Sequence, residues 1–389
     1  MNGNNKKLTL GILPSLGGSI ESQRIDRREG LFLNYYIPSY LTAFDEVRYF
    51  SYANENQMVT ERVRLFPNRW HIHKYFYAFL VPFIYRKAIR ECHLFRVMHL
   101  NGAVPAILAK MLYKIPFATT YGYNYVKFAE IEGHPIKAKF LKFLVPIFLR
   151  RANHIIVTTP DLRKEVEDWI GKTDKVTLIP NGVDTIKFVP NEKQELFPFF
   201  RLLTIGRLEK QKNLFFLLEV ISKLKSKREV KLTIIGKGSL SESLKKKVFQ
   251  ENLPVRFISH IPYESIVGHH READCYISTS LAEGHPKALI EAMSSGLACV
   301  VSHCPGNSMV VESGKTGFLL KLDDINVWVD ILLELSDVTE RRRSFGRNAR
   351  QWVIQNFDIN HTLANEINLL LRMARTKLHD QQMKIKFNH

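Results

Sequence analysis

The alternation of short apolar runs with longer helical patterns is the feature that most constrains the fold of this chain. The short runs have the length of strands and are rich in Val, Ile, Leu and Phe, and apolar residues recur at helical spacing between them. Strands that are buried on both faces and joined by crossover helices give this pattern. The sequence therefore predicts an α/β protein built on parallel sheets. The expected strands are 8–13, 46–52, 94–100, 117–121, 154–158 and 176–180, then 201–205, 231–235, 255–258, 275–279, 298–302 and 317–320.

The length of 389 residues suggests two or three domains, at about 150 residues per domain. A polar segment that contains Pro190 separates the two strand series and predicts a linker over 190–200. We expect a Rossmann-like domain over 1–189, a second over 201–360, and a helical tail over 361–389 that can pack back on the first domain. Open parallel sheets bind ligands at the carboxyl ends of their strands, so we expect the active site in a cleft between the two domains.

The net charge is unusual for a globular protein of ordinary composition. Lys and Arg number 56 against 38 Asp and Glu, which leaves a formal charge of +18. Residues 62–151 hold 16 Lys or Arg and three acids, Glu91, Glu130 and Glu132, so 16 − 3 = +13 of that charge falls there. An anionic partner is expected for this basic stretch.

Two basic, aromatic segments repeat each other 64 residues apart, at 79–88 and 143–152. Each reads Phe-Leu-Val-Pro, continues with apolar residues and ends in a basic pair and Ala. One interpretation is a pair of buried crossover helices whose basic pairs complement the helix dipole. The other is a surface that lies against an anionic bilayer, with its apolar side chains in the interface. The sequence leaves both interpretations open.

Cysteine usage and hydropathy indicate the compartment. The four cysteines, Cys92, Cys275, Cys299 and Cys304, form neither a disulfide framework nor a paired C-x-x-C zinc motif, which fits a reducing environment. The apolar runs of the chain are shorter than the roughly 18 residues of a membrane span. We therefore expect a cytoplasmic protein that can lie peripherally on the inner face of the cell membrane.

Two segments of the second half carry residues suited to binding an anion or a polyol. Strand 201–205 ends at Gly206, and Arg207 and Lys212 follow in the next loop, where they could hold a phosphate. Farther on, Glu283 lies in a loop and Glu291 in a short helix whose first amides could meet phosphate or sugar oxygens. A solvated basic turn and an exposed Lys287–Glu291 pair are the alternatives.

Three motifs occur together in an order and spacing that resemble one family. They are Asn181-Gly182-Val183-Asp184 with Phe188, Gly206-Arg207-Leu208 with Lys212, and Glu283 with Glu291. This set resembles the retaining nucleotide-sugar glycosyltransferases of family 4, which have the GT-B fold of two Rossmann-like domains facing across a cleft. The likeness is strong from about Val176 to Leu320 and diffuse before Ala152.

The resemblance implies roles for individual residues. Arg207 and Lys212 would bind the donor diphosphate and stabilise it as it leaves, Glu291 would bind the ribose, and Glu283 would contact the donor sugar and act as a third catalytic residue. The remaining donor-binding positions would be Gly17, Gly18, Gly206, Gly284, His285, Pro286, Lys287, Ala288 and Leu289. Gly17 and Gly18 resemble the loop beside the acceptor, and Tyr121 stands on the acceptor side where the family often has a histidine.

The implied function is transfer of a sugar, with retention, from a nucleotide sugar to a lipid-linked or polysaccharide acceptor. No metal or other cofactor is expected, because the chain has no Asp-x-Asp motif. A nucleotide-sugar epimerase of the same fold is an alternative. A basic nucleic-acid-binding protein is the other alternative, and only the charge of +18 points to it. Nucleic acid is not an expected partner, since the basic residues form no recognisable nucleic-acid motif.

Overall fold

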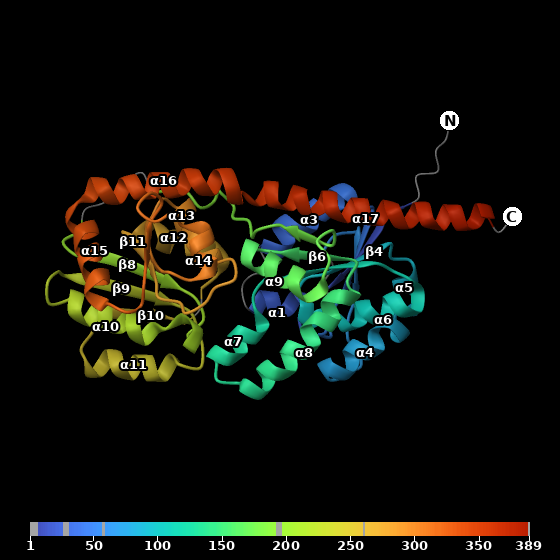
Figure 1. The fold of residues 1–389 in the computed structure, drawn as a ribbon, viewed down its shortest axis with the longest axis horizontal. Helices are drawn as coiled ribbons and strands as arrows, with labels where there is room; N and C mark the ends of the chain where they lie inside the picture. The colour runs from blue at the N-terminus through green and yellow to red at the C-terminus, as the bar shows by residue number, and fades with distance from the viewer. Residues whose placement is uncertain (1–6, 26–30, 57–58, 192–196, 260, 388–389) are drawn as a thin grey trace. The chain divides into compact units, whose positions relative to one another are not determined.

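The computed structural model describes residues 7–25, 31–56, 59–191, 197–259 and 261–387 (Figure 1). The chain forms two compact units. The first comprises residues 1–122, 140–179 and 360–389, and the second comprises residues 123–139 and 180–359. The linker predicted at 190–200 includes residues 192–196, which lie outside the described residues, and Phe200 already begins a strand of the second unit.

The first unit is a parallel sheet of seven strands with helices between them. Its strands are β1 (Thr9–Leu13), β2 (Glu46–Phe50), β3 (Val63–Phe66), β4 (Leu94–Val97), β5 (Phe117–Tyr121), β6 (His154–Val157) and β7 (Val176–Leu178). Its helices are α1 (Ile20–Ile25), the π-helix η1 (Phe32–Tyr36), α3 (Ile37–Ala43), α4 (Lys74–Ile84), α5 (Arg86–Arg90), the 3₁₀ turn η2 (Leu100–Gly102), α6 (Val104–Tyr113), α9 (Pro160–Ile170), most of α8 (Pro135–Arg151) and nearly all of α17 (Ile359–Phe387). The strand order is β3-β2-β1-β4-β5-β6-β7.

The second unit repeats this plan with six parallel strands. They are β8 (Phe200–Ile205), β9 (Val230–Ile235), β10 (Val255–Ile258), β11 (Cys275–Ser278), β12 (Ala298–Ser302) and β13 (Phe318–Leu320), in the order β10-β9-β8-β11-β12-β13. Its helices are α7 (Tyr125–Ile131), the 3₁₀ turn η3 (Lys210–Lys212), α10 (Leu214–Leu224), α11 (Ser241–Gln250), α12 (Tyr263–Glu272), α13 (Lys287–Ser294), α14 (Pro305–Val310), α15 (Ile325–Asp337) and α16 (Thr339–Phe357). Both sheets have the doubly wound order of Rossmann-like domains.

The predicted fold class is confirmed, and every predicted strand is present with ends that differ by up to three residues. The sequence missed β3, a strand of four residues that pairs only with β2 at the sheet edge. Arg64 interrupts its apolar residues and is exposed, and an edge strand needs no continuous apolar run because one side faces solvent.

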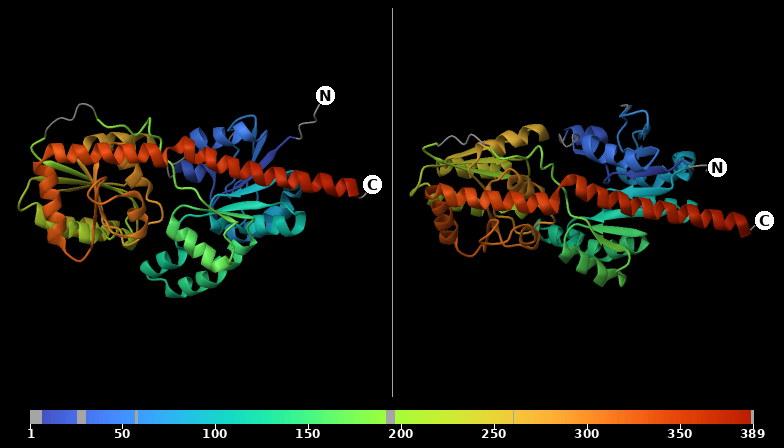
Figure 2. Two further views of the ribbon diagram at one scale, coloured as in Figure 1. Left: turned by 45° about the horizontal axis from the view of Figure 1, so that its top comes forward. Right: turned by 90° about the horizontal axis from the view of Figure 1, so that it is seen from above.

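The C-terminal helix α17 is part of the core of the first unit. Leu370 and Ala374 are fully buried in the same apolar cluster as Leu10 and Ile12 of β1, and Figure 2 shows α17 in red alongside the blue and cyan strands of this unit. Within the described part of the chain, no helix has both the length and the apolar character needed to cross a bilayer.

Candidate functional site

The candidate site lies where the strand order of the second sheet reverses. β8 and β11 are neighbours in this sheet although two strands and their helices separate them in the chain. The loop after β8 carries Gly206, Arg207 and Lys212, and the loop after β11 carries Glu283. Because parallel strands end at the same sheet edge, the two loops meet at the position where doubly wound sheets bind their ligands.

Lys212 and Glu283 form the central contact of the site. Lys212 Nζ lies 2.5 Å from Glu283 Oε1, and the two side chains are only 17% and 11% exposed. Ser280 Oγ donates to the same carboxylate oxygen at 2.7 Å. A Cβ added to Gly206 would lie 2.7 Å from Lys212 Cε, so the glycine leaves room for the lysine side chain. The structure thus brings together Gly206, Lys212 and Glu283.

Hydrogen bonds join the two loops along their length. The Leu281 amide donates to the Gln211 carbonyl at 2.8 Å, and Thr279 Oγ1 donates to the Asn213 carbonyl at 3.0 Å. The buried Gln211 side chain also donates to the Ala282 carbonyl. Gln211 was not among the predicted site residues, since a glutamine in a basic loop carries no sequence signal of its own.

A segment of the first half of the sequence packs on this loop, contrary to the expectation that all of residues 1–189 form the first domain. Glu132 Oε1 accepts from the Gln211 amide at 3.1 Å, and α7 packs on η3. Burial raises the pKa of Tyr123, while the nearby positive charge of Arg207 opposes this shift. Arg207 itself is exposed. The same loop therefore carries an exposed guanidinium near Tyr123 and Glu209, and a largely shielded amine, Lys212, that is paired with Glu283.

Glu291 lies in the second turn of α13 and is buried. Glu291 and Glu283 both act on Tyr276 of β11, whose pKa is raised well above its usual value by burial first and then by the charges of Glu283, Cys299 and Glu291. Pro286 is the N-cap of α13, and Gly296 follows the helix at a φ of +72°. The predicted Lys287, Ala288 and Leu289 form the first turn of α13, directly after Gly284, His285 and Pro286.

His285 is buried at 6% exposure, and neither ring nitrogen has a hydrogen-bond partner among the residues that the structure describes. Its ring packs edge-on against Phe357 with centroids 4.9 Å apart, and its carbonyl accepts from Asn181 Nδ2 at 3.0 Å. Asn181 of the Asn-Gly-Val-Asp motif therefore positions the loop that precedes α13. The motif itself pointed to this residue, but only the coordinates reveal the contact.

Two buried histidines predict acid sensitivity of the second unit. Burial lowers the pKa of both His270 and His285 to about 3, with smaller contributions from the charges of His269 and Lys287. Because the unfolded chain binds these protons near pH 6.5, stability falls as pH drops from 6.5 toward 3, by up to about 2 kcal/mol per histidine at pH 5. Urea unfolding at pH 7.5 and 5 should show this loss, and a His270→Phe/His285→Phe variant should show less of it. An equal pH dependence in the variant would contradict the assignment.

Three predicted residues belong to the first unit. Gly17 has a φ of +81°, and the Gly18 amide donates to the Ser15 carbonyl at 2.7 Å, so both shape a tight turn after β1. Tyr121 is fully buried, with its ring edge-on to Trp169. A role of Tyr121 on the acceptor side would therefore have to act through its backbone or the adjoining Gly122.

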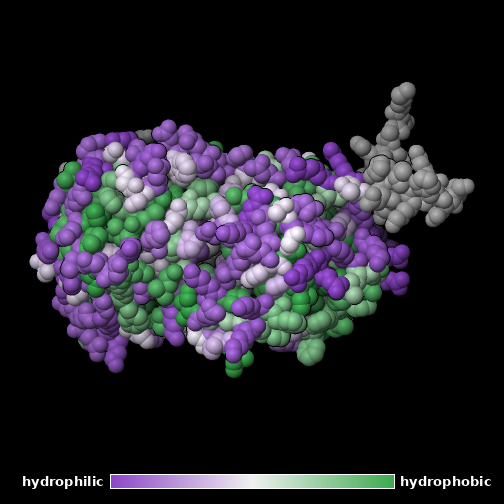
Figure 3. All heavy atoms as spheres, viewed as in Figure 1, coloured by the Kyte–Doolittle hydropathy of each residue, from purple (hydrophilic) through white to green (hydrophobic). Residues whose placement is uncertain are grey.

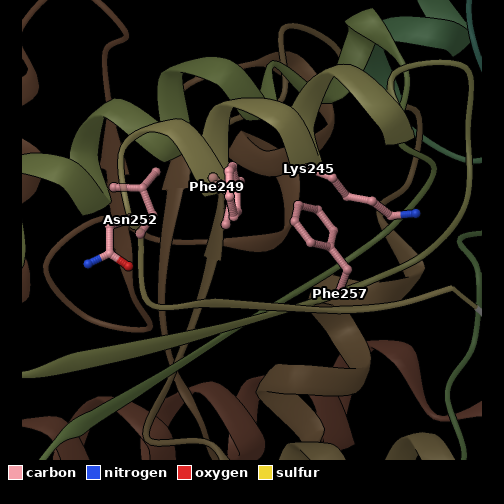
Figure 4. Close-up of a pocket in the computed structure, with 6 residues that line it drawn as sticks. Lys245, Phe249, Asn252 and Phe257 are labelled. Carbon is pink, nitrogen blue, oxygen red and sulfur yellow. The ribbon is translucent and has the colours of Figure 1, made fainter.

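The second unit also has a hollow of about 450 Å³ by α11 and β10 (Figure 4), apart from the residues of the candidate site. It is lined by Lys245, Val248, Phe249, Asn252, Leu253 and Phe257.

Among the residues that the structure describes, no group of three or more His, Cys, Asp or Glu is placed to hold a metal ion.

Comparison with known families matches most of the chain. Residues 187–352 match the family described as Glycosyl transferases group 1, and residues 39–187 match Glycosyltransferase Family 4. The chain is 30% identical over 198 residues to the Escherichia coli UDP-Gal:alpha-D-GlcNAc-diphosphoundecaprenol alpha-1,3-galactosyltransferase, covering 48% of this chain and 51% of that protein. It is 31% identical over 172 residues to the amylovoran biosynthesis glycosyltransferase AmsK of Erwinia amylovora, covering 42% of each. These matches span about half the length of each relative.

Solved structures share the fold over nearly the whole chain. Sucrose-phosphate synthase from Thermosynechococcus elongatus superposes with a TM-score of 0.77 at 17% identity, covering 95% of this chain and all of that one. Anabaena HepE in complex with UDP and glucose superposes with a TM-score of 0.73 at 17% identity, covering 93% and 99%. At this identity the likeness establishes the fold.

Proposed function

We propose that this chain, which belongs to the group 1, family 4 glycosyltransferases with the GT-B fold, transfers a hexosyl group from a nucleotide sugar to an acceptor hydroxyl. The observation that carries the proposal is the contact of Lys212 with Glu283 at the strand-order reversal of the second sheet. An amine, a carboxylate and the first turn of α13 meet there, and a sugar diphosphate offers matching groups: anionic oxygens for the amine and amides, hydroxyls for the carboxylate.

In the proposed reaction, Arg207 and Lys212 bind the diphosphate and stabilise the negative charge that develops as it leaves. Glu291 accepts from the ribose hydroxyls, and Glu283 accepts from a hydroxyl of the transferred sugar. Because these charges are in place before the reaction, they stabilise the transition state without reorganisation. This electrostatic stabilisation is the largest contribution of the protein to catalysis. We propose retention through an oxocarbenium-like transition state, with no metal, because the two cations serve the leaving group directly.

We propose a lipid-linked or polysaccharide acceptor and peripheral attachment to the anionic inner face of the cell membrane. The E. coli relative is named for a diphosphoundecaprenol-linked acceptor. The charge of +13 over residues 62–151 supports attachment to an anionic surface, since basic residues near a bilayer are attracted to acidic headgroups. Cytoplasmic nucleotide sugars would reach the site from the same side.

A screen of UDP-, GDP- and ADP-sugars by thermal shift tests the proposal. A donor at 100 times its dissociation constant should stabilise the protein by about 2.7 kcal/mol. The same donor, incubated with a polyprenyl-diphosphate sugar, should then give a lengthened lipid-linked product. Quantitative conversion of the donor to an epimer without acceptor would instead establish the epimerase alternative, and the lack of a shift with every nucleotide sugar would contradict the proposal.

A further inference from the structure

We infer that one face of α4 inserts into the interface of an anionic bilayer and holds the first unit against the membrane. This surface, the α4 apolar face, consists of Tyr75, Phe76, Phe79, Leu80 and Phe83, which are between 40% and 69% exposed. The area over α4 in Figure 3 is correspondingly green. The inference deepens the proposed function, on which its biological meaning rests, by naming the surface that meets the membrane.

The two faces of α4 differ: one is buried, as the crossover-helix interpretation expects, and the other is exposed, as a membrane-facing surface would require. Tyr77, Ala78, Val81 and Pro82 are buried, and Tyr77 packs edge-on against Tyr52. The neighbouring α6 is fixed to this side, since Tyr113 Oη donates to the Pro82 carbonyl at 3.0 Å. The helix is therefore anchored by its buried face. Its opposite face stays 40% to 69% exposed, with contacts from His73 and Lys74 at its N-terminal end.

The repeated segment in α8 shares part of this pattern of exposure. Phe79 and its counterpart Phe143 are 56% and 68% exposed, whereas Val81 and Val145 are 1% and 4% exposed. Each segment ends in an exposed basic pair, Arg86-Lys87 or Arg150-Arg151. All large apolar side chains that are exposed in the described part of the first unit lie between Trp70 and Phe143. The apolar exposure is thus confined to the basic stretch.

The charges around α4 favour a bilayer as the occupant. The sequence between Glu61 and Glu91 holds seven Lys or Arg and no acid, and Arg69, Lys74, Arg86, Lys87 and Arg90 are exposed. Aromatic rings with basic residues on either side suit the boundary between acyl chains and acidic headgroups, where the rings are buried and the cations remain hydrated. Lysine is depleted in protein–protein interfaces, so a protein partner fits this basic surface less well than a bilayer does.

The position of α4 also suits an acceptor that arrives in the membrane. Its first residue, Lys74, lies against the turn after β1, since a Cβ added to Gly17 would be 3.1 Å from Lys74 Cδ. The Tyr52 amide donates to the Gly18 carbonyl at 3.1 Å, and the Tyr52 ring packs on α4. A bilayer bound to the α4 apolar face would therefore bring a lipid-linked acceptor next to the turn for which the resemblance implies an acceptor-side position.

Cosedimentation with vesicles tests the inference. The full chain should bind vesicles of phosphatidylcholine mixed with phosphatidylglycerol more tightly than vesicles of phosphatidylcholine alone. Phe76→Ser/Phe79→Ser should weaken binding to the mixed vesicles at least about tenfold, because two aromatic rings no longer enter the interface. The matched control is Ile186→Ser/Phe249→Ser, which removes two side chains of the second unit that are 82% and 87% exposed. Its binding should stay within about twofold of the unchanged protein.

A second pair of variants separates insertion from charge. Arg86→Gln/Lys87→Gln should weaken binding to the mixed vesicles, because two cations near the headgroups are lost. Its control, Lys227→Gln/Lys246→Gln, removes the same charge from exposed positions of the second unit and should weaken vesicle binding less. Loss of binding in the arginine–lysine variant with full binding in the phenylalanine variant would overturn insertion. So would a dimer of the unchanged protein that Phe76→Ser/Phe79→Ser converts to a monomer without affecting vesicle binding.

Nucleotide-sugar binding distinguishes this inference from the proposed function. Thermal shift by the donor should be the same in the unchanged protein and in Phe76→Ser/Phe79→Ser, which also shows that the variant is folded. Vesicle binding without any donor shift would leave the membrane surface standing and contradict the proposed function. A donor shift without vesicle binding would overturn the surface together with the proposed membrane attachment, and would leave the proposed transfer from a nucleotide sugar uncontradicted.

Discussion

Lys212→Ala should lower the rate of glycosyl transfer by about 100-fold or more, the largest catalytic effect that we expect from a single substitution. The amine that stabilises the leaving diphosphate is lost, and because this stabilisation grows as the bond breaks, the loss should fall mainly on kcat. Steady-state kinetics with the donor identified by thermal shift would measure it. Arg207→Ala should show a loss of the same order.

Lys210→Ala provides a matched control. Lys210 lies in the same 3₁₀ turn, two residues before Lys212, and its side chain is exposed. Its removal deletes the same charge from the same loop, so a general effect of loop charge would lower both rates equally. We expect Lys210→Ala to keep the rate within about threefold, because the proposed reaction gives Lys210 no contact with the diphosphate and its exposed charge is screened by solvent at longer range.

The pair with Glu283 requires a further variant, because Lys212→Ala also leaves a largely shielded carboxylate without its cation. Glu283→Gln keeps the size of the side chain and the lysine, and removes the charge that holds Lys212. Glu283→Gln should lower the rate by itself, because Glu283 also accepts from the transferred sugar in the proposed reaction. Lys212→Arg keeps both charges of the pair and should therefore retain more activity than Lys212→Ala. Rates near that of the unchanged protein in both Lys212→Ala and Arg207→Ala would show that the site lies elsewhere.

The sequence predicted the parts of the site that follow from local pattern. Parallel strands end at one sheet edge, so recognising strands at 201–205 and 275–279 was sufficient to bring Lys212 and Glu283 to the same edge. Their contact distance and the hydrogen bond from Ser280 depend on side-chain conformation and were not predictable from strand order.

The contacts that the sequence did not reveal join segments far apart in the chain. Glu132 accepts a hydrogen bond from the amide of Gln211, 79 residues later in the chain. Asn181 donates to the carbonyl of His285, 104 residues later. Neither donor–acceptor pair produces a periodic pattern, and apolar periodicity reports burial rather than partners. The burial of Tyr121 was equally hidden, because a tyrosine at a strand end is typical of both exposed and buried positions.

Breaking the buried ion pair between β4 and α17 should destabilise the first unit by about 3–5 kcal/mol, the largest stability effect that we expect. Arg96 Nε lies 2.7 Å from Glu366 Oε1, and the two residues are 3% and 5% exposed. Tyr40 Oη donates to the same oxygen at 2.5 Å, and Arg96 also donates to Thr120 Oγ1 at 2.7 Å. Glu366→Gln removes one charge and leaves the guanidinium buried without its counter-ion. Urea unfolding followed by far-UV circular dichroism would measure the loss.

A double-mutant cycle tests whether the loss arises from the pair. The combined variant Arg96→Met/Glu366→Gln should be destabilised by clearly less than the sum of the single variants, because it leaves no buried charge alone. The exposed pair of Lys245 and Glu242 is the control, since removing a solvent-screened pair should leave the unfolding midpoint unchanged within error. Additive single effects at Arg96 and Glu366 would contradict a coupled pair.

The pH dependence of Arg96→Met gives the same pair an independent signature. Burial tends to raise the pKa of Glu366, but the charge of Arg96, with hydrogen bonds from Arg96 and Tyr40, lowers it below the usual value. The pair therefore stabilises the unchanged protein above the pKa of an unfolded glutamate, and this contribution is lost as pH falls through the lowered folded pKa. Without Arg96 the effect of burial, which is the largest, is opposed only by the hydrogen bond from Tyr40, so the folded pKa should rise above the unfolded one. Lowering the pH from 7 to 5 should then stabilise Arg96→Met relative to the unchanged protein, whereas a parallel pH dependence of the two would show that Arg96 is not what keeps Glu366 ionised.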